Sequence, residues 1–89
     1  MLKPGYTKQF RKDLKRMERQ GKSIEKLKSV IIQLVNQKPL DEGHRDHKLI
    51  GNYRDRRECH IESDWLLIYK TTEEEIIFER TGSHSDLFK

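Results

Sequence analysis

The chain has 89 residues, enough for one small domain but too few for a second hydrophobic core. Charged residues make up 38% of it and apolar residues 33%, a mixture close to that of disordered proteins. Leu, Ile, Val and Phe nevertheless account for 22 of the 89 residues, which is above the roughly 20% typical of disorder. We therefore expect a single folded domain over residues 1–89. No apolar run approaches the roughly 18–20 residues that cross a membrane, which excludes a membrane-spanning helix.

The net charge of +4 is unevenly distributed along the chain. Residues 1–28 hold ten Lys or Arg and three Asp or Glu, a balance of +7, whereas residues 29–89 have a balance of −3. The basic first third is either a solvated helical face or a contact surface for a polyanion, and the sequence leaves both open. A lone Cys59 cannot form an internal disulfide, and the start has no apolar signal peptide. These features favour a cytoplasmic protein.

The first part of the chain has the period of a helix. Phe10, Leu14 and Met17 recur at intervals of four and three residues, with charged residues between them. Thr7 is a suitable N-cap residue, and Gly21 suits the left-handed position that follows a helix. We expect a first helix between these two residues.

A second helix is predicted after Ser23, another N-cap candidate. Its apolar face consists of Ile24, Leu27, Ile31, Leu34 and Val35, and Pro39 prevents it from continuing. The connection over residues 20–23 is short, which favours an antiparallel helical hairpin.

Beyond Pro39 the apolar period changes to two, as in β-strands. Strands are predicted over residues 55–61, 65–69 and 76–81, with polar turns between them, and a further short strand at 2–5. Residues 65–69 are continuously apolar, which is typical of a central strand covered on both faces. The predicted order β-α-α-β-β-β indicates an α+β fold with two N-terminal helices packed on a small antiparallel sheet.

Four histidines, His44, His47, His60 and His84, lie in the strand-rich half. Taken singly, each is adequately explained as a surface or structural residue. His44 and His47 are spaced like a weak metal pair, but thiolate partners are absent apart from Cys59, which by strand parity points away from His60. We therefore predict no metal and no cofactor. Cys59 itself is better explained as a small core residue than as a nucleophile.

His60 and His84 have polar neighbours that suit acid–base chemistry. His60 shares a strand face with Arg56 and Glu58, Asp64 follows one turn later, and His84 comes just after the strand that carries Arg80. Metal-free RNA cleavage needs a base for the ribose 2′-hydroxyl, an acid for the departing 5′-oxygen and a cation near the phosphorane. Imidazole suits both proton transfers because its ordinary pKa, near 6.5, is close to working pH.

Three segments resemble YafQ-type toxins of the RelE superfamily. They are Asp-His-Lys-Leu-Ile-Gly at 46–51, Glu-Cys-His-Ile-Glu-Ser-Asp-Trp-Leu-Leu-Ile-Tyr at 58–69 and Arg-Thr-Gly-Ser-His-Ser-Asp-Leu-Phe at 80–88. Ser63 and Lys48 stand where relatives often have proline. The resemblance covers nearly the whole chain and implies a RelE-like fold. It further implies a bacterial type II toxin that cuts messenger RNA in the ribosomal A site and is neutralised by a bound antitoxin.

The resemblance also implies roles for single residues. His47, His60, Asp64 and His84 match the family's active-site residues, with Arg80, Trp65 and Phe88 as supports. His84 would be the general acid, either Asp64 or His60 the base, His47 a residue that positions the phosphate, and Arg80 the balancing cation. Phe88 and Trp65 would contact a base or brace the site, and Trp65 is equally well explained as a core residue. His44 has no counterpart and is expected at the surface.

The implied partners are a RelB- or DinJ-like antitoxin, the 70S ribosome with messenger RNA, and operator DNA through the antitoxin complex. Two alternatives remain from other functional classes. The superfamily also contains ParE-like proteins that inhibit DNA gyrase by binding it, and the chain could act mainly as an operon repressor together with its antitoxin. The histidines argue against a pure gyrase binder, because binding needs neither an acid nor a base.

Overall fold

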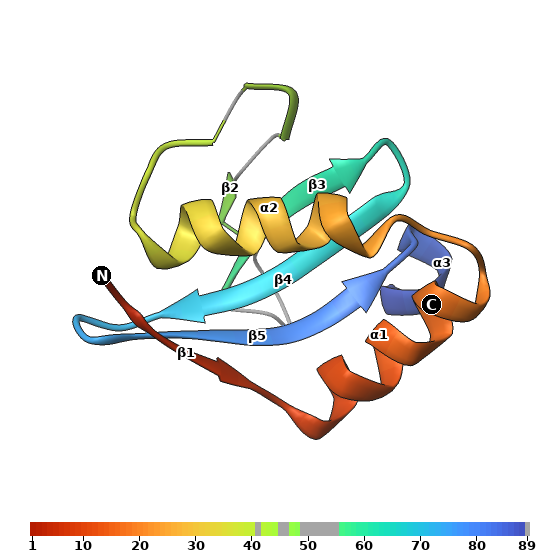
Figure 1. Ribbon diagram of the computed structural model, residues 1–89, viewed down its shortest axis with the longest axis horizontal. Coiled ribbons are helices and arrows are strands. Elements are labelled where there is room, and N and C mark those ends of the chain that lie inside the picture. The colour runs from red at the N-terminus through yellow and green to blue at the C-terminus, as the bar shows by residue number, and fades with distance from the viewer. Residues whose placement is uncertain (41, 45–46, 49–55, 89) are drawn as a thin grey trace.

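The computed structural model describes residues 1–40, 42–44, 47–48 and 56–88. Its elements in chain order are β1 (Lys3–Tyr6), α1 (Lys8–Arg19), α2 (Ile24–Val35), the 3₁₀ turn η1 (Glu42–His44), β2 (His47–Lys48), β3 (Arg57–Glu62), β4 (Trp65–Thr71), β5 (Glu75–Gly82) and α3 (His84–Leu87) (Figure 1). The α+β fold and the predicted helices and strands are confirmed. The sequence patterns missed η1, β2 and α3.

The five strands form one sheet in the order β1-β5-β4-β3-β2. Neighbouring strands from β2 to β5 are antiparallel, as predicted, but β1 runs parallel to β5. The prediction of a wholly antiparallel sheet was therefore wrong at this edge. A four-residue strand carries no sequence signal for its direction. Its direction instead follows from α1, which starts directly after β1 and packs beside β5.

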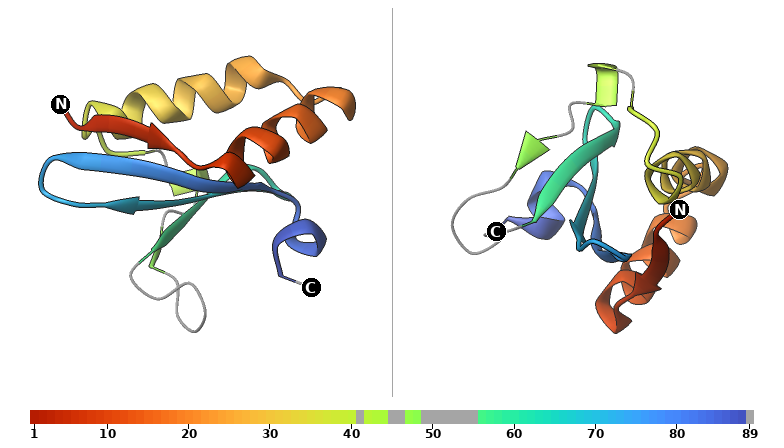
Figure 2. Two further views of the ribbon diagram at one scale, coloured as in Figure 1. Left: turned by 90° about the horizontal axis from the view of Figure 1, so that it is seen from below. Right: turned by 90° about the vertical axis from the view of Figure 1, so that its left-hand side faces the viewer.

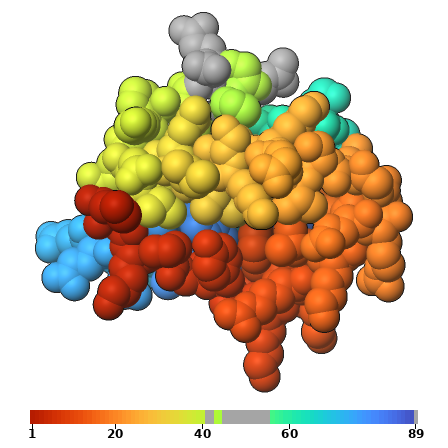
Figure 3. Space-filling view, in the orientation of Figure 1, coloured from red at the N-terminus to blue at the C-terminus, as the bar shows by residue number. Residues whose placement is uncertain are grey.

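The helices are divided between the two faces of the sheet. Helices α1 and α2 cover one face, and the short α3 lies on the other (Figure 2). The space-filling view, taken from the side of the two long helices, shows α1, α2 and β1 hiding most of the sheet (Figure 3). The strand ends near α3 are therefore reached from the face that α1 and α2 do not cover.

Strand β4 is buried on both faces, as its unbroken apolar run predicted. Trp65, Leu67 and Tyr69 point into the core beneath the two long helices, while Leu66 and Ile68 pack with Leu87 of α3 on the opposite face. The main core also contains Leu2, Phe10, Met17, Leu27, Val30, Leu34, Cys59, Ile61, Ile76 and Phe78. Cys59 is fully buried there, which confirms it as a small core residue.

The predicted helix ends are largely confirmed. The Thr7 hydroxyl accepts a hydrogen bond from the Phe10 amide at 3.0 Å, and Gly21 follows α1 with φ of +78°. Ser23 occupies the N-cap position of α2, but its side chain makes no capping hydrogen bond. Helix α2 ends at Val35, before Pro39, and Gln37 adopts a φ of +57°.

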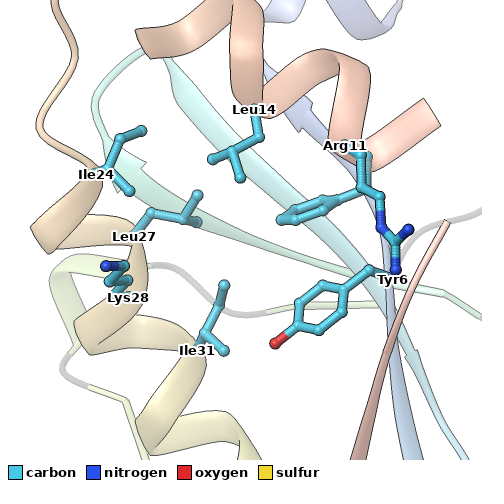
Figure 4. Close-up of a pocket in the computed structure, with 8 residues that line it drawn as sticks. Tyr6, Arg11, Leu14, Ile24, Leu27, Lys28 and Ile31 are labelled. Atoms are coloured by element: carbon cyan, nitrogen blue, oxygen red, sulfur yellow. The ribbon is translucent and has the colours of Figure 1, made fainter. Parts of the chain in front are cut away.

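Helices α1 and α2 pack mainly on the sheet and less on each other, so the predicted hairpin is splayed. Side chains of both helices and of Tyr6 line the gap, a groove of about 280 Å³ (Figure 4). Its lining is mostly apolar, with Arg11 and Lys28 as the charged members. Among the described residues, no helix is long and apolar enough to cross a membrane.

Candidate active site

The clearest pair of acid–base groups joins the start of α3 to the turn between β3 and β4. Asp64 Oδ1 accepts the backbone N–H of His84 at 3.0 Å and lies 2.9 Å from Nδ1 of the same residue. An ionised carboxylate only accepts hydrogen bonds, so Nδ1 carries the proton in this contact. The imidazole Nε2 of His84 is then the atom left to exchange protons with a substrate.

The contact with His84 also keeps Asp64 ionised. The His84 backbone N–H, followed by its side chain, lowers the pKa of the Asp64 carboxyl below its usual value. Both side chains are exposed, so this pair is open to solvent.

A second pair lies on β3. His60 is nearly buried, and its Nε2 is 3.4 Å from Oε1 of Glu58, which is also buried. The two residues are two positions apart on one strand and therefore share a face. The arrangement limits the motion of the His60 ring and supplies a carboxylate beside it.

The two histidines come together although 24 positions separate them in the sequence. The ring centres of His60 and His84 lie 5.9 Å apart, and the ring of Phe88 lies 6.2 Å from that of His84. Phe88 is 41% exposed, which leaves part of its ring able to contact a nucleobase. Two imidazoles, two carboxylates and an aromatic ring thus gather around α3, beside β3 and the turn between β3 and β4.

Arg80 is held by a residue that the sequence analysis did not single out. Its Nε donates to Asp13 Oδ2 at 2.7 Å and its Nη2 to Oδ1 at 3.3 Å. Asp13 belongs to α1 and is completely buried. Burial alone would raise the pKa of Asp13, but hydrogen bonds from Arg80, the Thr81 amide and Gln9 outweigh it and lower that pKa.

Trp65 is a core residue. Its side chain is fully buried, and its Nε1 donates to the Thr81 hydroxyl at 2.8 Å. Of the alternatives left open for Trp65, the core residue is confirmed, and its burial favours bracing of the site over contact with a base. Trp65 instead connects β4 to β5, because Thr81 is the residue of β5 that follows Arg80.

His44 is not the surface residue we expected. It is half buried, and its Nδ1 lies 2.7 Å from the backbone oxygen of His60. A carbonyl can only accept, so this nitrogen donates and helps to hold η1 against β3. His47 lies in β2, where its backbone pairs opposite Glu58. The strand register thus brings the His47 backbone next to the Glu58–His60 pair.

The remaining part of the first motif, residues 46 and 49–51, lies outside the described residues, as does residue 55 of the predicted third strand. Arg56, which we placed beside His60, forms an ion pair with Glu79 at 2.7 Å. Among the residues that the structure describes, no three His, Cys, Asp or Glu side chains are grouped to hold a metal ion.

Sequence reasoning missed Asp13 and α3 as parts of the site. The run Ser83-His84-Ser85-Asp86 has the spacing of a capping box, and the structure contains that box: Ser83 accepts from the Asp86 amide, and Asp86 from the Ser83 amide. That signal could have identified α3. Glu58 was placed on the same strand face as His60 from the sequence, and the structure shows the two side chains in contact. The pairing of Asp13 with Arg80, 67 positions away, left no local sign.

Comparisons with known proteins agree with the resemblance seen in the sequence. A family model described as the bacterial toxin of a type II toxin-antitoxin system, YafQ, matches residues 2–89. The mRNA interferase toxin YafQ of Escherichia coli K12 is 42% identical over 84 residues, which cover 93% of this chain and 91% of the relative.

Solved structures match equally well. The crystal structure of YafQ from E. coli BL21(DE3) has a TM-score of 0.95 at 38% identity, and each chain is covered completely. YafQ in the E. coli DinJ–YafQ toxin-antitoxin complex has a TM-score of 0.92 at 39% identity, covering 99% of this chain and 98% of that one. Since the family model spans nearly the whole sequence and the fold agrees throughout, the chain belongs to the YafQ family of bacterial toxins of type II toxin-antitoxin systems.

Proposed function

We propose that this chain is an endoribonuclease, an mRNA interferase that cleaves messenger RNA in the ribosomal A site by metal-free acid–base chemistry. The observation that carries the proposal is the convergence of the His84–Asp64 and His60–Glu58 pairs at one end of the sheet. The E. coli relative is named an mRNA interferase, which supports the same reaction.

The contacts distinguish the roles of the two carboxylates and the two histidines. Asp64 is already engaged twice by His84, so we assign it to orienting that ring and assign the base to His60. His60 takes the proton of the ribose 2′-hydroxyl, and the 2′-oxygen attacks phosphorus. His84 protonates the departing 5′-oxygen, which leaves a 2′,3′-cyclic phosphate and a 5′-hydroxyl.

The other predicted residues complete this site. Arg80 stabilises the negative charge that develops on the phosphorane, and His47 positions the phosphate. Phe88 lies beside His84 with part of its ring exposed, which supports contact with a nucleobase. Trp65 acts indirectly, by holding β4 and β5 in register through Thr81.

The proposed partners follow from the same assignment. The E. coli relative crystallised in complex with DinJ, which supports a cognate antitoxin for this chain. Binding of operator DNA by the antitoxin complex belongs to the same proposal. The ribosome and its messenger RNA are the proposed substrate assembly, and the cytoplasm is the proposed compartment.

The test compares His84→Ala with the parent in a translating extract. We expect messenger cleavage to fall by about 10² or more, because the leaving oxygen loses its acid. Ser85→Ala, an exposed change on the same short helix, is the matched control and should cleave at the parent rate. Enzyme treated with EDTA and then desalted should also cleave normally.

Parent-like cleavage by His84→Ala would contradict the assigned acid. Loss of activity after EDTA treatment, restored by a divalent ion, would contradict metal-free chemistry. Gyrase-dependent DNA breaks without messenger cleavage by the parent would establish the ParE-like alternative instead.

A further inference from the structure

Helix α1 continues, through its side chains, the hydrogen bonding that β1 begins. Strand β1 pairs with β5 only as far as Phe78. Beyond it, the Thr7 hydroxyl donates to the oxygen of Glu79 at 2.8 Å. Asp13 Oδ2 accepts the Thr81 amide at 3.1 Å, and Arg16 Nη2 donates to the Thr81 oxygen at 3.1 Å. Three side chains at the start and on one face of α1 thus satisfy the backbone of β5 next to the candidate active site.

Asp13 accepts more hydrogen bonds than the backbone of β5 needs from it. Its two oxygens accept from five groups, namely Arg80 Nε, Arg80 Nη2, Arg16 Nη1, Gln9 Nε2 and the Thr81 amide, at 2.7 to 3.3 Å. A neutral side-chain oxygen would be enough to accept the hydrogen bond from the Thr81 amide. Burying a charged carboxylate in its place is costly unless the charge is paired. The pairing with two guanidinium groups therefore explains why a carboxylate is buried here.

The same network extends to α3. Arg16 Nη2 lies 3.6 Å from Oδ2 of Asp86, and that oxygen caps the Ser83 amide directly before His84. Gly82 allows this approach, because a Cβ atom there would lie 2.7 Å from Arg16 Nη2 and 3.0 Å from the Asp86 Cβ. Contacts thus run without a break from Asp13 to the start of the helix that carries His84.

We propose that Asp13 is a positioning residue for RNA cleavage, which holds the Arg80 guanidinium directly and, through Arg16 and Asp86, the start of α3 at His84. The inference rests on the proposed nuclease function. Two oxygens on one guanidinium fix its plane as well as its location, so Arg80 meets the phosphorane already oriented. A displacement of about 1 Å in such a group is enough to cost on the order of 10²-fold in rate.

Asp13→Asn tests this role. Its amide nitrogen would face a donor, so the bonds to Arg80 and to the Thr81 amide cannot all survive. We expect kcat for cleavage on ribosomes to fall by about tenfold or more. We expect KM for ribosomes to change less than about twofold, because Asp13 is completely buried and cannot touch the ribosome.

The matched control is Val30→Ala, a buried change in α2 that weakens the core away from the site. Both variants are assayed well below their melting temperatures. Val30→Ala should keep the parent kcat, which separates loss of positioning from loss of stability. If Asp13→Asn also keeps the parent kcat, the proposal is overturned.

A double-mutant cycle with Arg80→Gln shows whether Asp13 acts through Arg80. The combined rate loss of the double variant should be smaller than the product of the two single losses, because the part of the Asp13 effect that acts through Arg80 is already absent. Rate losses that multiply would show that the two residues act independently, and would overturn the proposal. The Arg80 Nε–H resonance, followed by NMR, should also move in Asp13→Asn whether or not the protein cleaves RNA.

Should Asp13→Asn fail to fold, Arg16→Gln gives the same test, since the Arg16 side chain is 30% exposed and is easier to replace. It removes the bond to Thr81 and the contact with Asp86, so we expect kcat to fall about threefold or more with KM unchanged. An unchanged kcat would overturn the link to α3.

A parent protein that does not cleave messenger RNA at all counts against the proposed function, whereas an active parent with fully active variants counts against this inference alone.

Discussion

The two histidines of the site are held in different ways. His60 is nearly buried beside Glu58, whereas the His84 side chain is 55% exposed and held by Asp64. A restrained ring suits a base that must be aligned before attack, and an exposed ring suits an acid that must follow the departing oxygen. This difference supports the assignment of His60 as base and His84 as acid.

The pKa of Asp64 leads to a prediction about pH. Because the N–H groups of His84 lower that pKa, Asp64 remains ionised from about pH 5 to pH 9, and the acid limb of the rate profile must come from another group. Asp64→Asn should therefore cleave about tenfold more slowly and yet keep its acid limb. Single-turnover cleavage across this pH range is the measurement. Disappearance of the limb in Asp64→Asn would show that Asp64 itself is the titrating base.

At the scale of elements, the site depends on how α1 and α3 are attached to β5. Helix α1 contributes side-chain hydrogen bonds to the edge of β5, and α3 begins directly after that strand with its own capping box. Only four residues make up α3, so its own helical hydrogen bonds stabilise it little. Its cap and the packing of Leu87 against Leu66 and Ile68 must hold it in place.

The attachment of α1 to β5 through Asp13 should make the free energy of unfolding depend on pH in the acid range. The Asp13 pKa is lowered in the folded state, so between the folded and unfolded pKa values the unfolded chain binds more protons. Its contribution to the free energy of unfolding is therefore complete above the usual Asp value, near pH 4, and is lost as pH falls through the folded value.

Urea unfolding between about pH 2 and pH 6 would measure this loss. Asp13→Asn should lower stability at pH 6 by roughly 3 kcal/mol and show a flatter decline toward acid pH, because the titrating group is gone. Glu62→Gln is the comparison, since Glu62 also has a lowered pKa but binds Lys26 and Lys22 at the surface. It should cost less than about 1 kcal/mol. If the free energy of unfolding declines equally steeply toward acid pH in the parent and in Asp13→Asn, Asp13 is not the group that causes the decline.

At the scale of the whole molecule, the basic helices and the site are on different faces but meet at one edge. Helix α2 lies across the covered face of the sheet, whereas α1 runs along the edge next to α3 (Figure 1). The contact between Arg16 and Asp86 joins α1 to α3. Helix α1 also carries more exposed cations than α2, namely Lys8, Arg11, Lys12, Lys15 and Arg19 against Lys26 and Lys28.

This arrangement favours α1 as the part of the basic region that binds ribosomal RNA. Replacing the exposed Lys8, Lys12 and Lys15 with Gln should weaken ribosome binding and reduce its salt dependence by about 0.7–0.9 in slope for each phosphate that is no longer neutralised. The single-turnover rate at saturating ribosomes should not change. Lys3→Gln with Lys38→Gln, exposed changes outside the two long helices, is the control. Unchanged affinity and slope in the α1 variant would identify that surface as a solvated helical face.

Much of this protein could be predicted from residue order because the signals are local. Helix periods, the Thr7 cap and the unbroken apolar run of β4 act within a few positions and were confirmed, whereas Ser23 occupies its N-cap position without a side-chain hydrogen bond. The grouping of His60 and His84 was predicted from a resemblance, and the structure does bring the two rings together. The three motifs were therefore sufficient to identify the family.

Tertiary structure decided the features that depend on residues far apart in the chain. The parallel direction of β1, the burial of Trp65 and the pairing of Asp13 with Arg80 all depend on how α1 lies against β5. An acidic residue on an amphipathic helix has the same sequence pattern whether it faces water or a guanidinium. The local sequence therefore determined the elements and the chemistry that they carry. Only the packing of α1 on the sheet decided that Asp13 is buried and paired with Arg80.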